Sequence, residues 1–361
     1  MNLYRLNTDL EGRNSIKIPD IEDDNDEMDM IENNEEKNWI GLDEINAHER
    51  DRMIVKNEEK HIYYVNGVPM KCSVTGFKSF FFHPFDDDGL IRTMFRNSKT
   101  VGKHFKSKYG NSNYENMTHS GILKYWSSVS TEGTRFHLMM EYLLNIHQDM
   151  ITKFSVNEIM EECVKISNSK GIIPDMKRIK LISQFLVSFF KKGWKPYRVE
   201  WKIYDEEYGI AGTIDAVFTK NIKDKTEYMI IDWKTVVATT NKDSSSYYCY
   251  RPFENMKASK MNEYLIQLNL YAHILKTRYD ITVKNLMAIM ISPHNIKDYV
   301  LEVIDMMPAL KIYKNNINFY DDILKWKTLE PGSQTAYPFL PEPFFLKENE
   351  EETRNLNLLN I

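Results

Sequence analysis

The sequence predicts an α/β protein with a central mixed β-sheet flanked by helices and a helical addition on the N-terminal side. Three runs rich in β-branched and aromatic residues, 197–204, 210–218 and 228–233, follow one another with short polar turns between them. Helical patterns precede and follow these runs, and another apolar run spans 285–292. From the length of 361 residues we expect one elaborated domain with extensions rather than two equal domains.

Charge is distributed unevenly along the chain. Residues 1–36 carry a net charge of −9 and residues 341–361 one of −3, so the total of −5 leaves +7 for the residues between. Ten acidic residues and no basic residue fall within 19–36, and such a segment buries too little apolar surface to fold. We therefore expect an acidic, mostly disordered extension over 1–55 and a basic remainder suited to binding phosphate.

Residues 56–130 are expected to form a hairpin followed by helices. Asn66-Gly67 is a favourable two-residue turn between apolar runs, which predicts the hairpin over 61–72. Helical stretches then follow at 74–82 and 90–109. This part is expected to elaborate the central fold on its N-terminal side.

Residues 131–330 are expected to hold the core of the fold. A helix is predicted over 131–147, and another begins at Ser155, whose hydroxyl forms a capping box with Glu158. A third is predicted over 174–192, with Pro174 in its first turn. The remaining predicted segments are helices over 262–278 and 305–326 and a C-terminal tail over 331–361.

Composition argues against several classes of protein. The chain has no run of 18 apolar residues and no apolar signal segment, so we expect a soluble intracellular protein without membrane contact. Its three cysteines, Cys72, Cys163 and Cys249, are far apart, which argues against a disulfide framework and an iron–sulfur cluster. No phosphate-binding G-x-x-x-x-G-K-[ST] loop occurs, so no nucleotide cofactor is expected. The Lys, Asn and Ile content suggests an AT-rich genome. A viral origin, with a location in the host cytoplasm or nucleus, is therefore one alternative.

Two carboxylates and a lysine are expected to meet at the ends of two consecutive strands. Asp215 lies in one run and Asp232-Trp233-Lys234 closes the next, and Lys234 shares a face with Asp232 because strand side chains alternate. Phosphodiester hydrolysis must neutralise an anionic phosphate and make a nucleophile from water, and paired carboxylates that hold Mg²⁺ do both. The alternative is a strand end that exposes an ordinary Asp–Lys salt bridge.

Four short motifs occur in a fixed order along the chain. They are Gly133-x-x-x-His137 in a predicted helix, Ile214-Asp215 and Asp232-x-Lys234 in the strands, and Gln267-x-x-x-Tyr271 in the following helix. Over about residues 73–291 the chain thereby resembles the RecB-like branch of the PD-(D/E)XK nuclease superfamily. The segments GTRFHLMME, GTIDAVF and IIDWKT, together with Ser73-Val74-Thr75, are similar to those of one group within that branch. This group is the mitochondrial genome maintenance exonuclease type and its relatives in large DNA viruses and phages.

The resemblance implies a divalent metal site that takes Mg²⁺ or Mn²⁺. Asp215 and Asp232 would be the main ligands, and the backbone carbonyl of Trp233 would complete the first site. His137 would add an imidazole nitrogen, which favours Mn²⁺ relative to Mg²⁺. The alternative for His137 is an ordinary core histidine on the apolar face of its helix.

The same resemblance implies roles for further residues. Lys234 would position or deprotonate the attacking water, with a pKa that a nearby metal ion lowers. Glu200 would hold a more distant water or a second metal ion. Gln267 and Tyr271 would orient Lys234 and the scissile phosphate, and Arg135 would contact phosphate.

A basic stretch within 90–109 is a candidate DNA contact. Its residues include Arg92, Arg96 and Lys103, which recur along the predicted helix together with phenylalanines. A solvated amphipathic face explains the same pattern equally well.

The function implied by the resemblance is a metal-dependent DNA exonuclease that leaves 5′-phosphates, acting on single-stranded ends in replication, repair or recombination. Two alternatives stay open: a structure-specific or single-strand endonuclease with the same active site, and a nuclease-like module that binds DNA without cutting it. DNA is the expected partner. The tails are candidate contacts for a replication or recombination protein, although the C-terminal one can also pack on the domain.

Overall fold

The computed structural model describes residues 40–82, 91, 95, 114, 117–236 and 247–316. The chain divides into two compact units, Met1–Ile40 and Gly41–Ile361, and every described residue except Ile40 belongs to the second. The predictions for the acidic segment before residue 40, for Arg92, Arg96 and Lys103, and for the C-terminal tail lie outside the described residues. None of the helices within the described ranges has the length and apolar character needed to cross a membrane.

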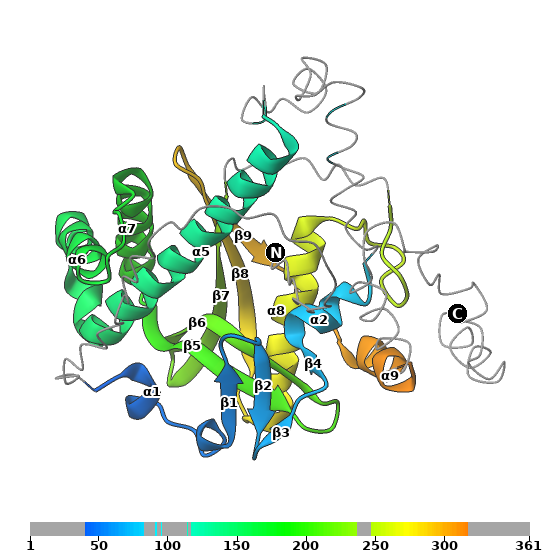
Figure 1. The fold of residues 1–361 in the computed structure, drawn as a ribbon. Helices are drawn as coiled ribbons and strands as arrows, with labels where there is room; N and C mark the ends of the chain where they lie inside the picture. The colour runs from blue at the N-terminus through cyan, green and yellow to red at the C-terminus, as the bar shows by residue number, and fades with distance from the viewer. Residues whose placement is uncertain are drawn as a thin grey trace, which may run out of the picture. The chain divides into compact units, whose positions relative to one another are not determined.

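A six-stranded mixed sheet forms the centre of the second unit (Figure 1). Its strands are β4 (Cys72–Ser73), β5 (Lys195–Asp205), β6 (Ile210–Ile222), β7 (Lys225–Thr235), β8 (Val283–Ile291) and β9 (Ile296–Leu301). The order is β4-β6-β7-β8-β9, and β5 also pairs with β6. The β4–β6 and β7–β8 pairs are parallel and the others are antiparallel.

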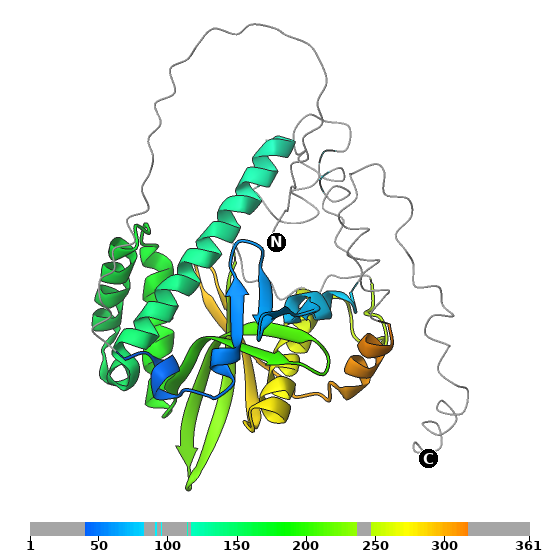
Figure 2. The same ribbon diagram turned by 60° about the horizontal axis from the view of Figure 1, so that its bottom comes forward.

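Helices cover both faces of this sheet (Figures 1 and 2). They are α2 (Val74–Ser79), α8 (Lys260–Arg278) and α9 (Met307–Asn315) on one face, and α5 (His119–His147), α6 (Val156–Ser169) and α7 (Met176–Lys191) on the other. Ile230 and Ile231, neighbours in β7, belong to different apolar cores, as the alternation of side chains along a strand requires. The predicted α/β class, with a mixed sheet flanked by helices, is confirmed.

Local sequence explains where these elements begin and turn. Ser155 and Glu158 form the predicted capping box of α6. β2 (Ile62–Val65) and β3 (Val68–Pro69) meet through Asn66-Gly67, which adopts left-handed φ angles of 51° and 80°. Asparagine and glycine tolerate these angles well, so the predicted hairpin turn is confirmed.

Residues 41–55 belong to the folded unit, which corrects the predicted extension over 1–55. α1 (Leu42–Ile45) buries Leu42 in the core beside α5, and β1 (Ile54–Asn57) pairs with β2 in a small three-stranded sheet. Between them, in the short 3₁₀ helix Asp51–Met53, Asp51 accepts hydrogen bonds from Arg198 and Trp201 of β5 at 2.7 and 2.8 Å. The acidic composition that predicts disorder ends at residue 36, so it gives no reason to extend the disordered segment to 55.

Two helix starts differ from those predicted. α5 begins at His119, where the Thr118 side chain accepts from the Gly121 N–H, so it crosses the predicted boundary between 56–130 and 131–330. α7 is capped by Asp175, whose carboxylate accepts from two backbone N–H groups, so Pro174 lies before the cap rather than in the first turn. A side-chain cap therefore decides both starts.

The central strands extend beyond the predicted runs. β6 continues to Ile222 and turns into β7 through Lys223 and Asp224, which have φ angles of 47° and 63°. Asp215 consequently lies within β6 rather than at its end. β9, a partly exposed edge strand, was not predicted. The predicted helix over 305–326 corresponds to α9, and its part after residue 316 lies outside the described residues.

Candidate active site

The candidate site lies where β6 and β7 separate. Their antiparallel pairing ends at Ala216 and Ile231, and the first residues of β6 pair with β4 instead. The backbone of Trp233, beyond this point, is bonded by side chains: its N–H donates to Asp215 Oδ2 at 2.9 Å, and its carbonyl oxygen lies 3.0 Å from His137 Nε2. Two side chains of the site thus satisfy backbone groups of β7 beyond the end of its pairing with β6.

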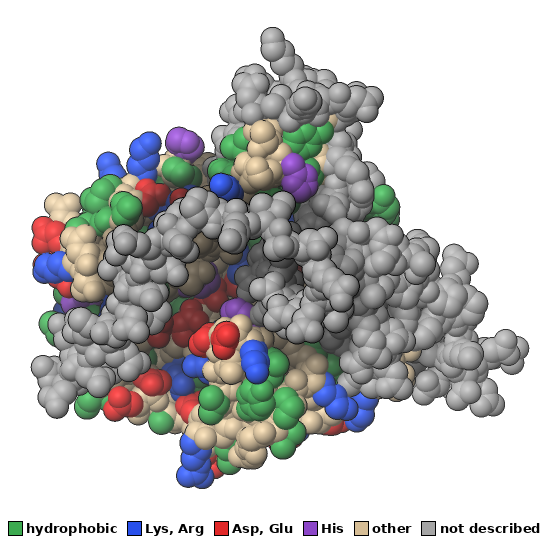
Figure 3. All heavy atoms as spheres, viewed as in Figure 1, with side chains coloured by type: hydrophobic (Ala, Val, Ile, Leu, Met, Phe, Trp, Pro, Cys, Tyr) green, Lys and Arg blue, Asp and Glu red, His purple; other side chains and the backbone are tan. Residues whose placement is uncertain are grey.

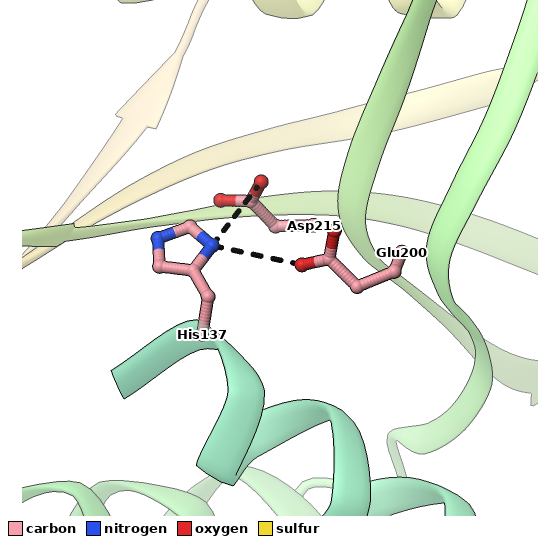
Figure 4. A group of neighbouring side chains, drawn as sticks. All are labelled: His137, Glu200 and Asp215. Carbon is pink, nitrogen blue, oxygen red and sulfur yellow. Dashed lines mark ion pairs between the residues drawn. The ribbon is translucent and has the colours of Figure 1, made fainter. Parts of the chain in front are cut away.

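His137, Glu200 and Asp215 converge from α5, β5 and β6 (Figure 4). His137 Nδ1 lies 3.6 Å from Glu200 Oε1 and 3.6 Å from Asp215 Oδ1. One ligand atom from each of the three residues falls within 4.8 Å of the others. In the space-filling view, acidic side chains gather in a hollow beside α5 (Figure 3). One nitrogen and two carboxylates at these distances are suited to a divalent cation.

A backbone carbonyl determines how His137 faces the carboxylates. A carbonyl oxygen only accepts hydrogen bonds, so His137 Nε2 must be the donor to Trp233. In the neutral imidazole this leaves the lone pair on Nδ1, the nitrogen that faces Glu200 and Asp215. The carbonyl of Trp233, which the resemblance assigned to the metal, therefore has His137 as a partner and keeps one further lone pair.

The charge of His137 follows from its neighbours. Burial alone lowers the pKa of His137, but the Asp215 carboxylate and a hydrogen bond to Glu200 outweigh burial and raise the pKa to about 9. In the absence of a cation, the imidazolium thus neutralises part of the negative charge of the site.

Glu200 has a strained backbone at the centre of β5. Its φ of 44° lies in the left-handed region, which non-glycine residues rarely adopt in a strand. Val199 and Trp201 flank it and belong to opposite apolar cores, although residues two apart in a regular strand share a face. The backbone distortion accompanies the orientation of the Glu200 carboxylate toward His137.

The buried Asp232 and the partly exposed Lys234 form an ion pair on β7. The Lys234 Nζ lies 2.7 Å from Asp232 Oδ2, and this carboxylate oxygen has no hydrogen bond of good geometry. Asp232 is only 2% exposed. Burial alone lowers the pKa of Lys234, but Asp232 and Asp215 outweigh burial and raise it, so Lys234 is a cation when the site holds no metal ion.

Gln267 and Tyr271 of α8 lie against the acidic site. Gln267 Nε2 donates to Asp232 Oδ1 at 3.4 Å, and Asp232 is in turn the ion-pair partner of Lys234. Tyr271 is buried, and burial raises the pKa of its phenol well above the usual value. Its ring lies close to Gly212, where an added Cβ would come within 2.8 Å of Tyr271 Cε1.

Gly133 explains how α5 comes close enough for His137 to reach the sheet. A Cβ at this position would lie 3.2 Å from the Thr235 Oγ1 of β7, so a larger side chain would push the helix away. His137 lies one turn further along the same helix. The spacing of Gly133 and His137 thus places a glycine at the close contact between helix and sheet, and a candidate metal ligand one turn later.

Two residues near the site were missed by the sequence interpretation. Lys78 of α2 is 8% exposed, and its Nζ donates to Gln267 Oε1 at 3.0 Å. Burial lowers the pKa of Lys78, and the ring of Tyr264 lies 5.8 Å from its Nζ and 5.5 Å from that of Lys234. The signal for Lys78 was its place on the apolar face of a helix, four residues after Val74.

Arg135 is the predicted DNA contact that the structure describes, and it is exposed on α5. Arg92, Arg96 and Lys103 lie outside the described residues. Within the described residues, the site draws on α2, α5, β5, β6, β7 and α8.

The chain matches no protein-family model and no curated protein. Among solved structures, the crystal structure of SSO0001 is similar at 13% sequence identity, over 50% of this chain and 77% of that chain, with a TM-score of 0.26. A similarity of that size supports no conclusion about fold family or function.

Proposed function

We propose that this chain is a divalent-metal-dependent deoxyribonuclease with a PD-(D/E)XK core of the RecB-like kind. It hydrolyses phosphodiester bonds at DNA ends, with a preference for single strands, and leaves 5′-phosphates. This activity would serve DNA replication, repair or recombination. The observation that carries the proposal is the convergence of His137, Glu200 and Asp215 beside the Asp232–Lys234 ion pair.

The donor set fits Mg²⁺ or Mn²⁺. His137 Nδ1 and the carboxylates of Glu200 and Asp215 would hold the ion, together with the Asp232 Oδ2 that lacks a well-formed hydrogen bond. A bound ion supplies neutralisation of the phosphate and a more acidic water. The mixture of one imidazole with several carboxylates favours Mn²⁺.

Lys234 supplies the positive charge of the reaction. Its ammonium is held protonated by Asp232 and Asp215, so it can orient a water and stabilise the negative charge that builds up on the phosphate. Gln267 holds Asp232 in position through one carboxylate oxygen.

The test is cleavage of DNA by the purified chain with Mg²⁺ or Mn²⁺. We expect end-labelled linear single strands to be shortened and closed circles to survive. The Lys234→Met and Asp215→Asn variants should lose about 10²-fold or more in rate. Matched controls are Lys284→Met, an exposed lysine on the neighbouring strand β8, and Asp298→Asn, an exposed aspartate on β9, which should cut normally.

The alternatives give different results in the same experiment. Cutting of a circular single strand would replace the exonuclease with an endonuclease that uses the same site. Binding of DNA without metal-dependent cutting would favour the non-cutting module. Full activity in Lys234→Met would overturn the site assignment.

A further inference from the structure

Lys78 joins α2 to the candidate site from a buried position. Its Nζ lies 3.0 Å from Gln267 Oε1 and 3.5 Å from Glu263 Oε2. Glu263 has a second cation, because the Nζ of Lys260 lies 2.8 Å from its other carboxylate oxygen. The contact to Gln267 therefore distinguishes Lys78 from Lys260.

The chemistry of the neighbours fixes the orientation of the Gln267 amide. An ammonium group only donates hydrogen bonds and an ionised carboxylate only accepts them. Gln267 must therefore turn its oxygen toward Lys78 and its NH₂ toward Asp232, as the contacts of 3.0 and 3.4 Å require. Among the described residues of α2, Lys78 is the one that donates to the Gln267 oxygen, so its loss removes the donor that opposes a flipped amide.

We propose that Lys78 is a positioning residue, which orients the amide of Gln267 so that Gln267 holds the Asp232 carboxylate for a divalent cation. The inference rests on the proposed function, because that function assigns Asp232 to the cation. The two contacts of Asp232 are then complementary: Gln267 binds Oδ1 and Lys234 pairs with Oδ2. Gln267 thus fixes the carboxylate through Oδ1, and Oδ2, which has no hydrogen bond of good geometry, is the oxygen for the metal.

The test measures Mn²⁺ affinity by calorimetry and needs no substrate. Lys78→Met keeps an unbranched apolar side chain, one atom shorter, and removes the donors. We expect it to weaken Mn²⁺ binding about 10-fold, the effect of losing a residue that orients a ligand. Gln267→Leu should weaken binding to a similar extent. The double variant should be no weaker than Gln267→Leu alone, because Lys78 acts through Gln267.

Lys260→Met is the matched control, since it removes the other ammonium on Glu263 without touching Gln267. It should bind Mn²⁺ as the unmodified chain does. Thermal unfolding checks that each variant is folded, and Lys78→Gln replaces Lys78→Met in the cycle if the methionine variant does not fold.

The outcomes separate the two proposals. Normal Mn²⁺ affinity in the folded Lys78 variant, or effects of Lys78 and Gln267 that add in full, would overturn the positioning role alone. Absence of Mn²⁺ binding by the unmodified chain would overturn the proposed function together with it.

Discussion

His137 occupies its position through two different kinds of contact. One ring nitrogen donates to the backbone of Trp233, and the other faces Glu200 and Asp215. The first contact selects the tautomer and the second provides the negative charge that raises the pKa. A histidine on a helix next to a sheet thereby becomes a candidate ligand rather than a core residue.

We expect Mn²⁺ to bind more tightly as the pH rises. With a pKa of about 9, His137 is protonated at neutral pH, and a metal ion takes only the neutral ring, so binding releases about one proton. Affinity should rise roughly tenfold per pH unit between about pH 6 and pH 8. Calorimetry in buffers of different ionisation enthalpy counts the protons.

The stability of the cation-free chain should fall as the pH rises, whereas its affinity for Mn²⁺ increases. Because its pKa is raised in the folded chain, protonated His137 stabilises the fold. This contribution to the free energy of unfolding is complete below the ordinary pKa of 6.5 and is lost as the pH rises through about 9. His137→Ala should lose both dependences. A pH-independent Mn²⁺ affinity in the unmodified chain would contradict this account.

At the scale of elements, the approach of α5 to β7 determines whether His137 reaches the carboxylates. We expect Gly133→Val to weaken Mn²⁺ binding about 10-fold, because the added side chain meets Thr235 and displaces the helix that carries a ligand. Helix content by circular dichroism should stay the same. Replacing Thr235 by alanine in the Gly133→Val chain should restore part of the affinity, whereas no recovery would mean that the clash lies elsewhere.

The order of the central elements could be predicted because each has a strong local pattern. The run of β-branched and aromatic residues over 228–233 predicts β7, and the Ser155 capping box predicts the start of α6. Two-residue β4 could not be predicted, since its only basis is a long-range pairing with β6. The contact of His137 with the Trp233 carbonyl could not be predicted either, because it depends on where β6 and β7 part.

The candidate site likewise contains residues that could be grouped from the sequence and residues that could not. Asp215, Asp232 and Lys234 could be grouped from the sequence because their strands are consecutive and strand geometry fixes their faces. Lys78 could not be grouped with Gln267, which is 189 residues further along the chain, although its place on an apolar helix face marked it as unusual.

At the scale of the whole molecule, the folded unit requires the segment 41–55. Asp51 is an ion-pair partner of Arg198, which is 4% exposed, and it also accepts from the buried Trp201. Removing one partner of a buried ion pair leaves an uncompensated charge. The segment therefore acts as part of the core.

We expect a chain that starts at residue 41 to unfold at the same denaturant concentration as the full chain. A chain that starts at residue 56 should be destabilised by at least about 3 kcal/mol, because Arg198 then lacks its carboxylate partner. Asp51→Ala in the full chain should reproduce most of that loss. Equal stability of the two truncated chains would show that the segment contributes nothing to folding.

The separation of β6 from β7 also creates a built-in reporter of the site. The Trp233 amide proton points at a carboxylate oxygen of Asp215, 2.9 Å from its nitrogen, instead of at a strand carbonyl. Its NMR chemical shift should therefore respond directly when a cation binds to Asp215. One backbone resonance can thus follow ligand binding at this centre in real time, with no label on the DNA and no turnover.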